Sequence, residues 1–292
     1  MILLPCIDDD QRAAALRRRL DLPRWRAAEL GHEAVRIVRE GVYRAPSGLP
    51  VHIADLIDRA MAAKRSLPPE AELPVGLGAA GATTVRVAQA TSLDAARELL
   101  ERGHRVLILN FANGVHPGGG YLSGARAQEE SLVRCGALIA TLDGDPMYAA
   151  HARRPTPDST AWSILSPDVP FFRDEEGTLL EAPWTVSVLT CAAPVATHIG
   201  TEIATPLMAD RIGRVLDIAH GFGFDGLVLG AWGCGAFGND PQAVAAQFVD
   251  HLQRRDGWFA HVTFAISDWS PDRRFLGPFR DAFDAALPNR RG

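Results

Sequence analysis

The sequence predicts an α/β fold, in which a mostly parallel or mixed sheet is covered by helices on both faces. From about residue 82 onward, runs of buried-strand character alternate with segments whose apolar residues recur at helical spacing. Such alternation is typical of sheets whose strands are joined by helical crossovers. Between residues 9 and 66 only helical spacing is found. We therefore expect a helical N-terminal extension over residues 1–80 and an α/β domain over residues 81–292.

The predicted helices of the extension follow from the spacing of its apolar residues. Apolar residues recur at helical spacing in RWRAAELGHEAVRIVREGVY, residues 24–43, and again in VHIADLIDRAMAAK, residues 51–64. The stretches APSGLP, residues 45–50, and SLPPEAELPVGLGAAG, residues 66–81, are rich in proline and glycine. Such residues interrupt regular structure, so we expect them to separate these helices from the α/β domain.

The α/β domain is expected to alternate between strands and helices. The predicted strands are TTVRVAQ (83–89), RVLILNF (105–111), WTVSVLT (184–190), GLVLGAW (226–232) and HVTFAIS (261–267). The predicted helices cover residues 92–103, with Ser92 as a candidate N-cap, and residues 125–142, 209–221, 241–254 and 272–286. Residues 143–184 show neither helical nor strand spacing of their apolar residues. A long irregular excursion from a compact domain often covers a functional site, and we expect this role here.

Composition excludes several classes of protein. The formal net charge of −5 offers no basic surface for duplex DNA, so no direct DNA binding is expected. The cysteines, Cys6, Cys135, Cys191 and Cys234, form no C-x-x-C pair, and the histidines lack ligand spacing, so neither a metal nor a cofactor is expected. The N-terminus MILLPCIDDD does not resemble a signal peptide, and no apolar run is long enough to span a membrane. A cytoplasmic location is predicted.

Two glycine-rich loops follow predicted strands. NFANGVHPGGG, residues 110–120, follows the second strand, and GCGAFGND, residues 233–240, follows the fourth. Ligands of parallel sheets bind at the carboxyl ends of strands, and clustered backbone N–H groups suit a diphosphate. The loops could instead be tight turns that need positive φ angles. No G-K-[ST] follows, and the G-x-G-x-x-G spacing is missing, so the pattern alone indicates a pocket for an anionic ligand.

Glu129 and Glu130 lie in the first turns of the helix that follows the first glycine loop. Acidic residues stabilise a helix N-terminus by about 0.3–1 kcal/mol, which is one explanation for them. Adjacent helical residues point roughly 100° apart, so the two carboxylates cannot flank a glycosidic bond as an ordinary glycosidase pair does. One carboxylate could perform the chemistry while the other positions the substrate.

The segment GGGYLSGARAQEE, residues 118–130, resembles the signature of the poly(ADP-ribose) glycohydrolases. The preceding NFAN resembles the ligand loop of macrodomains. The segments that look like bacterial-type members of the family are REGVY, WSILSPDVPFFRDEEG, SVLTCAAP and GAWGCGAFGN. The likeness extends from about Arg24 to the last helix. It implies a macrodomain-like mixed sheet flanked by helices, with a helical N-terminal extension.

This resemblance also implies an activity and a set of site residues. The expected reaction is hydrolysis of the ribose–ribose O-glycosidic bond of poly(ADP-ribose), mainly exo, which releases ADP-ribose. Glu130 would be the general acid/base, and Glu129 would hold a ribose hydroxyl. The implied substrate-binding residues are Asn113 at the distal ribose, Gly118, Gly119 and Gly120 in the catalytic loop, Gln128, and Gly235, Ala236, Phe237, Gly238 and Asn239 around the diphosphate. Phe237 would also orient the distal ribose.

Other functions stay open from the sequence. The protein could bind ADP-ribose without cleaving it, or could act on mono-ADP-ribosylated protein or another ADP-ribose conjugate. The expected partners are poly(ADP-ribose) or ADP-ribosylated proteins. Residues Gly114, His116, Tyr121 and Val195 depart from those usual in the family, and this leaves the fine substrate preference open. Contacts with adenine also stay open, because Thr91, Asp268 and Trp269 lie near strand ends but could equally have core or surface roles.

Overall fold

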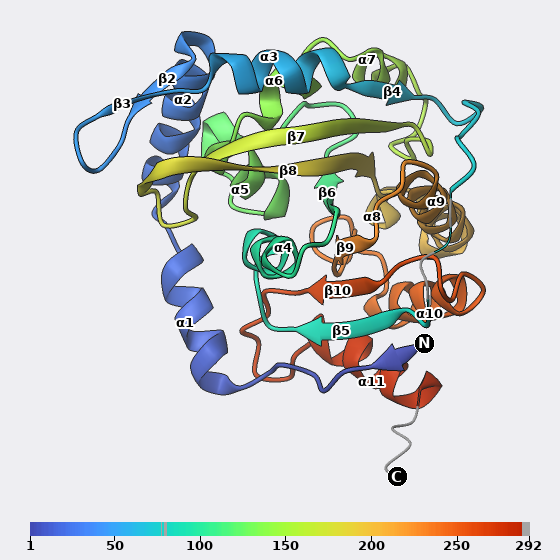
Figure 1. Ribbon diagram of the computed structural model, residues 1–292. Coiled ribbons are helices and arrows are strands. Elements are labelled where there is room, and N and C mark those ends of the chain that lie inside the picture. Colours follow the sequence, from blue (N-terminus) through green and yellow to red (C-terminus); the bar gives the residue numbers. More distant parts are fainter. Residues whose placement is uncertain (77, 79–80, 288–292) are drawn as a thin grey trace.

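Eight strands form one mixed sheet at the centre of the computed structural model, which describes residues 1–76, 78 and 81–287 (Figure 1). The strands in order across the sheet are β1 (Ile2–Leu3), β5 (Thr84–Ala88), β10 (His261–Ala265), β9 (Gly226–Leu229), β6 (Val106–Ala112), β8 (Leu179–Ala192), β7 (Ser163–Arg173) and β4 (Arg65–Leu67). Neighbours from β1 to β8 are parallel, and β7 is antiparallel to both β8 and β4. The predicted mixed sheet is confirmed.

Helices cover both faces of the sheet. The helices are α1 (Asp10–Leu20), α2 (Arg24–Glu40), α3 (Ala54–Ala63), α4 (Ser92–Glu101), the 3-10 helix η1 (Tyr121–Ser123), α5 (Gln128–Cys135), α6 (Leu138–Leu142), α7 (Pro146–Ala152), α8 (Ala196–Ile199), α9 (Thr201–Gly221), α10 (Pro241–Gln253) and α11 (Leu276–Ala286). Along β6, Leu107 and Leu109 pack in the cluster that includes side chains of α9, α10 and α11. Val106 and Ile108 pack in the cluster that includes α4, α5 and α6. This alternation follows from the two-residue period of a strand.

The N-terminal 80 residues contain strands as well as the predicted helices. The strands β1 and β4 form the two edges of the central sheet, and β2 (Val42–Arg44) pairs with β3 (Pro50–His52) in a separate hairpin. The helices α2 and α3 meet the rest of the chain in a buried cluster that includes Ile37, Ile57 and Phe172. Residues 77, 79 and 80 of the predicted linker lie outside the described residues. The division of the chain at residue 80 stays a prediction.

The expectation of an irregular excursion over residues 143–184 is wrong. This segment contains α7 and most of an antiparallel hairpin formed by β7 and β8. The alternation of side chains along β7 could not be recognised in the sequence because the β7–β8 register shifts between Ser166 and Val169. Asp168, within this shift, has a φ of 47°. A bulge of this kind interrupts the alternation of inward and outward side chains on which strand prediction depends.

Two further local predictions are wrong. The helix expected over residues 125–142 is divided into α5 and α6, because Gly136 pairs with Phe171 of β7 and Ala137 donates to the carbonyl of Pro170. Thr91, not Ser92, caps α4, since its hydroxyl accepts a hydrogen bond from the backbone N–H of Asp94 at 3.1 Å. Among the described residues, no helix combines the length and apolar character needed to cross a membrane.

Candidate active site

A cavity of about 390 Å³ opens where four parallel strands end. The lining residues at these strand ends are Ala90 and Thr91 after β5, Phe111 and Ala112 of β6, Trp232 and Gly233 after β9, and Ile266 and Ser267 after β10. The carboxyl ends of parallel strands are the usual place for a ligand in such a sheet. The position of the cavity therefore agrees with the expectation from the two glycine-rich loops.

Gln128 fixes the start of α5 against the end of β6. Its Oε1 accepts a hydrogen bond from the backbone N–H of Phe111 at 2.9 Å. Its Nε2 donates to the carbonyl of Leu109 at 2.8 Å and to the hydroxyl of Ser92 at 3.1 Å. Gln128 also lines the cavity. These bonds hold the two following glutamates at a fixed place beside the strand end.

Glu129 is buried in a polar pocket of the protein, with 3% of the residue exposed. One carboxylate oxygen accepts a hydrogen bond from the backbone N–H of Asn113 at 2.7 Å, and the other lies 3.4 Å from Nδ2 of Asn110. Burial, followed by the charge of Glu130, raises the pKa of Glu129 to about 8 although both hydrogen bonds oppose the shift. Glu129 therefore keeps its proton at neutral pH more readily than an exposed glutamate.

Glu130 is 7% exposed, and only one of its two carboxylate oxygens has a hydrogen-bond partner among the described residues. Oε1 accepts a hydrogen bond from the backbone N–H of Gly120 at 2.9 Å, whereas Oε2 is buried and has no partner among the described residues. Gly119 has a φ of 62°, and a Cβ there would overlap Oε1 of Glu130 and lie 3.0 Å from Oε2 of Glu129. The bare backbone of Gly119 thus lets both carboxyl groups approach one point of the loop.

Asn113 organises the turn that follows β6. Its side-chain oxygen accepts hydrogen bonds from the backbone N–H groups of Val115 and His116, both at 2.9 Å. Because its own backbone N–H donates to Glu129, the turn and the first glutamate are joined. A side-chain amide that closes a turn in this way is a common role of asparagine.

The second glycine-rich loop presents three consecutive N–H groups. Within the part of the chain that the structure describes, the backbone N–H groups of Gly235, Ala236 and Phe237 donate to no protein acceptor, and all three residues line the cavity. Asn239 lies behind the loop and donates from Nδ2 to the carbonyls of Pro194 at 2.8 Å and Gly233 at 3.0 Å. Such an arrangement is suited to an anion such as a diphosphate.

The predicted site residues thus fall into three groups. The cavity lining includes Gln128, Gly235, Ala236 and Phe237. A second group adjoins the lining residues Ala112 and Gln128 in the sequence and contains Asn113, Gly118, Gly119, Gly120, Glu129 and Glu130. Gly238 and Asn239 are not part of the lining, and Gly238 lies against Thr197. In the described ranges, no three His, Cys, Asp or Glu side chains gather as metal ligands would.

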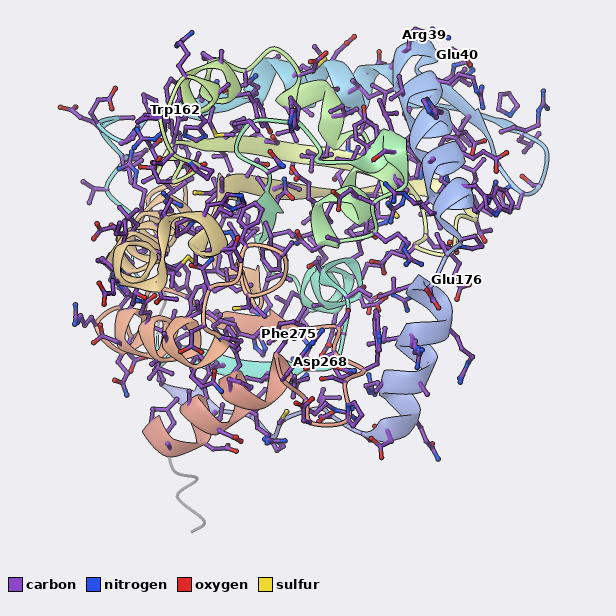
Figure 2. All side chains as sticks on the ribbon, turned by 180° about the vertical axis from the view of Figure 1, so that it is seen from behind. Arg39, Glu40, Trp162, Glu176, Asp268 and Phe275 are labelled. Atoms are coloured by element: carbon purple, nitrogen blue, oxygen red, sulfur yellow. The ribbon has the colours of Figure 1, made fainter. Side chains whose placement is uncertain are left out.

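The three residues considered for adenine contacts, Thr91, Asp268 and Trp269, differ in their position relative to the cavity. Thr91 and Trp269 line the cavity, whereas Asp268 is buried and accepts hydrogen bonds from the backbone N–H groups of Phe275 and Leu276 at 2.8 and 3.0 Å. Figure 2 shows Asp268 and Phe275 close together. Asp268 therefore has a structural role in holding the segment that leads into α11.

One wall of the cavity was expected only in part from the sequence. Leu20 of α1 and Glu175 of the turn between β7 and β8 both line it. Arg19 joins these two elements, because it forms ion pairs with Glu175 at 2.6 Å and with Asp94 at 2.5 Å. Glu175 lies within residues 143–184, which were expected to cover a functional site, whereas no local signal identified Leu20, which meets Glu175 only in the folded chain.

The chain is similar to a known protein family and to several solved structures. The family described as microbial-type PARG, catalytic domain, matches residues 31–174, where PARG is poly(ADP-ribose) glycohydrolase. The PARG structure from Thermomonospora curvata is 40% identical, with 88% of this chain and 99% of that chain covered and a TM-score of 0.82. Its complex with the inhibitor ADP-HPD is 39% identical over the same shares of the chains, with a TM-score of 0.80.

A second bacterial structure is also similar. The PARG from Deinococcus radiodurans in complex with ADP-ribose is 34% identical, with 81% of this chain and 100% of that chain covered and a TM-score of 0.72. A comparison with curated protein sequences found no match. The identity and the nearly complete coverage of the solved structures go beyond a shared fold. The chain therefore belongs to the microbial-type poly(ADP-ribose) glycohydrolases.

Proposed function

We propose that this protein hydrolyses the ribose–ribose O-glycosidic bond of poly(ADP-ribose), mainly at the end of the chain, and releases ADP-ribose. The observation that supports this most directly is the state of Glu130, whose Oε1 is held by Gly120 while Oε2 is buried without a protein partner among the described residues. A positioned carboxyl group with one uncommitted oxygen can act as a general acid and then as a general base. Similar structures hold ADP-ribose or the inhibitor ADP-HPD.

Binding would use the backbone more than charged side chains. The N–H groups of Gly235, Ala236 and Phe237 would donate to the diphosphate, with Gly238 and Asn239 completing that loop. Phe237 would pack against the distal ribose, which Asn113 would contact. Gln128 would keep the start of α5 in place beside the substrate. Gly118, Gly119 and Gly120 would let the ribose approach the two carboxyl groups.

The reaction would proceed in two proton transfers through Glu130. As the bond between the anomeric carbon and the leaving 2′-oxygen breaks, the oxygen keeps the electron pair and takes the proton of Glu130. The carbon develops oxocarbenium character, and the negative diphosphate nearby stabilises it. The resulting carboxylate then takes a proton from water, whose oxygen bonds to the carbon. Glu129 would hold a ribose hydroxyl throughout.

The cavity wall supports cleavage at the chain end. Leu20 and Glu175 line the cavity, and Arg19 fixes the two elements together. A wall of this kind favours a terminal unit over an internal one. The substrate would be free poly(ADP-ribose) or a polymer on ADP-ribosylated proteins. We also propose that the protein works in the cytoplasm, needs neither metal nor cofactor, and has a macrodomain-like catalytic domain over residues 81–292.

The first experiment measures release of ADP-ribose from poly(ADP-ribose) by the wild type and by Glu130→Gln, together with ADP-ribose affinity. The variant should retain affinity but lose about 10²- to 10⁴-fold in rate, the usual contribution of general acid/base catalysis. If the wild type binds ADP-ribose and releases nothing from any conjugate, the protein is a reader. If it acts only on mono-ADP-ribosyl conjugates, the proposed substrate is wrong.

A further inference from the structure

The turn between α1 and α2 concentrates positive charge in a chain that is acidic overall. Residues 17–26, which we call the elbow, contain five arginines and one aspartate, against a net charge of −5 for the whole chain. Two of these arginines are engaged, since Arg19 pairs with Asp94 and Glu175 and Arg26 pairs with Glu29. Exposed arginines without carboxylate partners attract an anion rather than stabilise the fold.

Three elbow arginines are exposed and free of such partners. Among the described residues, no carboxylate lies in ion-pair distance of Arg17, Arg18 or Arg24, and all three are exposed. Arg24 uses Nε to donate to the carbonyl of Ser123 at 2.9 Å, which leaves the other N–H groups of its guanidinium available. The elbow therefore presents several positively charged hydrogen-bond donors to the solvent.

The elbow also contains an exposed aromatic residue, Trp25, which directly follows Arg24 and precedes Arg26 in the sequence. Trp25 is 69% exposed, a larger fraction than that of Trp269 at 42%. It is the second residue of α2, whose buried side includes Ala27, Leu30 and Ala34. Its indole ring thus contributes little to the core. Exposed aromatic rings flanked by arginine are the usual platform for stacking single-stranded bases beside a phosphate backbone.

A chain of hydrogen bonds connects the elbow to the proposed general acid. Arg24 donates to the carbonyl of Ser123, the hydroxyl of Ser123 donates to the carbonyl of Gly120 at 2.9 Å, and the N–H of Gly120 donates to Glu130. Leu20 of the elbow lines the cavity itself. Figure 1 shows α1 and α2 along the side toward which the arrows of β5 and β10 point. The elbow therefore borders the site beside the reacting group.

The chemistry of the leaving group fits this surface. In poly(ADP-ribose) the leaving 2′-oxygen belongs to an adenosine ribose, so the same ribose carries an adenine, and a diphosphate follows. A polymer that leaves the cavity beside Glu130 thus presents a base first and two negative charges next. We propose that the elbow is a subsite for the penultimate ADP-ribose unit, in which Trp25 stacks on its adenine and Arg17, Arg18 and Arg24 face its diphosphate.

This proposal rests on the proposed function and makes it more specific. A mono-ADP-ribosyl conjugate has no second adenine and no second diphosphate, so the elbow contributes nothing to its binding. A polymer gains contacts outside the cavity that ADP-ribose lacks. The elbow therefore gives a preference for polymer over mono-ADP-ribosyl conjugates, and this preference weakens with salt because phosphate contacts release counterions.

The test compares binding of ADP-ribose with binding of an oligomer of two ADP-ribose units. Affinities are measured in the Glu130→Gln background, so that turnover does not consume the oligomer. Adding Trp25→Ala should weaken binding of the two-unit oligomer by about 5- to 100-fold, the range for one stacked base, and leave ADP-ribose affinity unchanged. Trp25→Phe should restore most of the loss, and the double variant Arg17→Ala, Arg18→Ala should flatten the salt dependence.

A matched control and three contrary outcomes complete the design. Arg39→Ala removes an exposed arginine at the other end of α2, labelled in Figure 2, and should change neither affinity. Equal losses for ADP-ribose and the oligomer would overturn the proposal, and so would no loss for either. Oligoadenylate RNA that binds as tightly as the oligomer and in the same Trp25-dependent way would make the elbow a general nucleic-acid platform instead. Failure of the proposed function is seen separately, as a wild type that releases no ADP-ribose.

Discussion

At the scale of single residues, the buried position of Glu129 predicts how the stability of the protein depends on pH. Burial raises the pKa of Glu129 from 4.5 to about 8, so the folded chain holds a proton there that the unfolded chain has released. The free energy of unfolding should therefore fall as the pH rises from about 4.5 to about 8, by at most about 1.4 kcal/mol per pH unit from this group. Glu129→Gln should remove that part of the slope, which urea unfolding at several pH values measures.

The exposed Glu176, labelled in Figure 2, provides the control for this prediction. Glu176→Gln should give a stability curve parallel to that of the wild type over the same pH range. Parallel curves for Glu129→Gln and the wild type would mean that Glu129 titrates alike in the folded and unfolded chains. The polar pocket formed by Asn110 and Asn113 would then be sufficient to keep the carboxylate charged.

Gly119 supports a second prediction at this scale. Substitution by alanine brings a Cβ into overlap with Glu130 and also strains a backbone at a φ of 62°. Gly48 has a φ of 86° and open space around it, so Gly48→Ala introduces the backbone strain alone. Gly48→Ala should lose about 1–2 kcal/mol of stability. Gly119→Ala should lose at least as much, and it alone should lose ADP-ribose release. Normal release by Gly119→Ala would show that the loop need not approach Glu130 so closely.

At the scale of secondary-structure elements, α7 supports the turn after β6 through His151. Its Nε2 accepts from the backbone N–H of Thr160 at 3.2 Å, so Nδ1 carries the proton and donates to the carbonyl of Gly114 at 3.1 Å. Burial lowers the pKa of His151, which keeps this neutral form. His151→Ala should lower the free energy of unfolding by about 1–3 kcal/mol, because buried partners lose their hydrogen bonds. Urea denaturation checks this, with the exposed His52→Ala expected to match the wild type.

Local patterns predicted the elements that are regular along their whole length. Alternating strands and helices identified β5, β6, β9 and β10, and the glycine loops at their ends indicated the cavity. The second half of β8 was predicted as the strand over residues 184–190. The strand β7 and its pairing with β8 were missed because a bulge near Asp168 interrupts the alternation of buried and exposed side chains.

Tertiary contacts explain what the sequence could not predict about the site. Gln128 and Asn239 were predicted as ligand contacts, yet their side-chain amides bond to the protein's own backbone, which depends on how distant segments meet. The same holds for Leu20 in the cavity wall. Their contacts with a substrate stay predictions.

At the scale of the whole molecule, the N-terminal residues complete the central sheet. The strand β1 pairs with β5 at one edge, and β4 pairs with β7 at the other. Separation of residues 1–80 from the rest would expose backbone groups of both inner strands to solvent and to other chains. We therefore predict that the extension unfolds together with the sheet. Native-state hydrogen exchange in low concentrations of urea should give amides of β4 and β7 the same opening free energy. Earlier exchange throughout residues 1–80, with β5 and β7 still protected, would instead identify the extension as an independent unit.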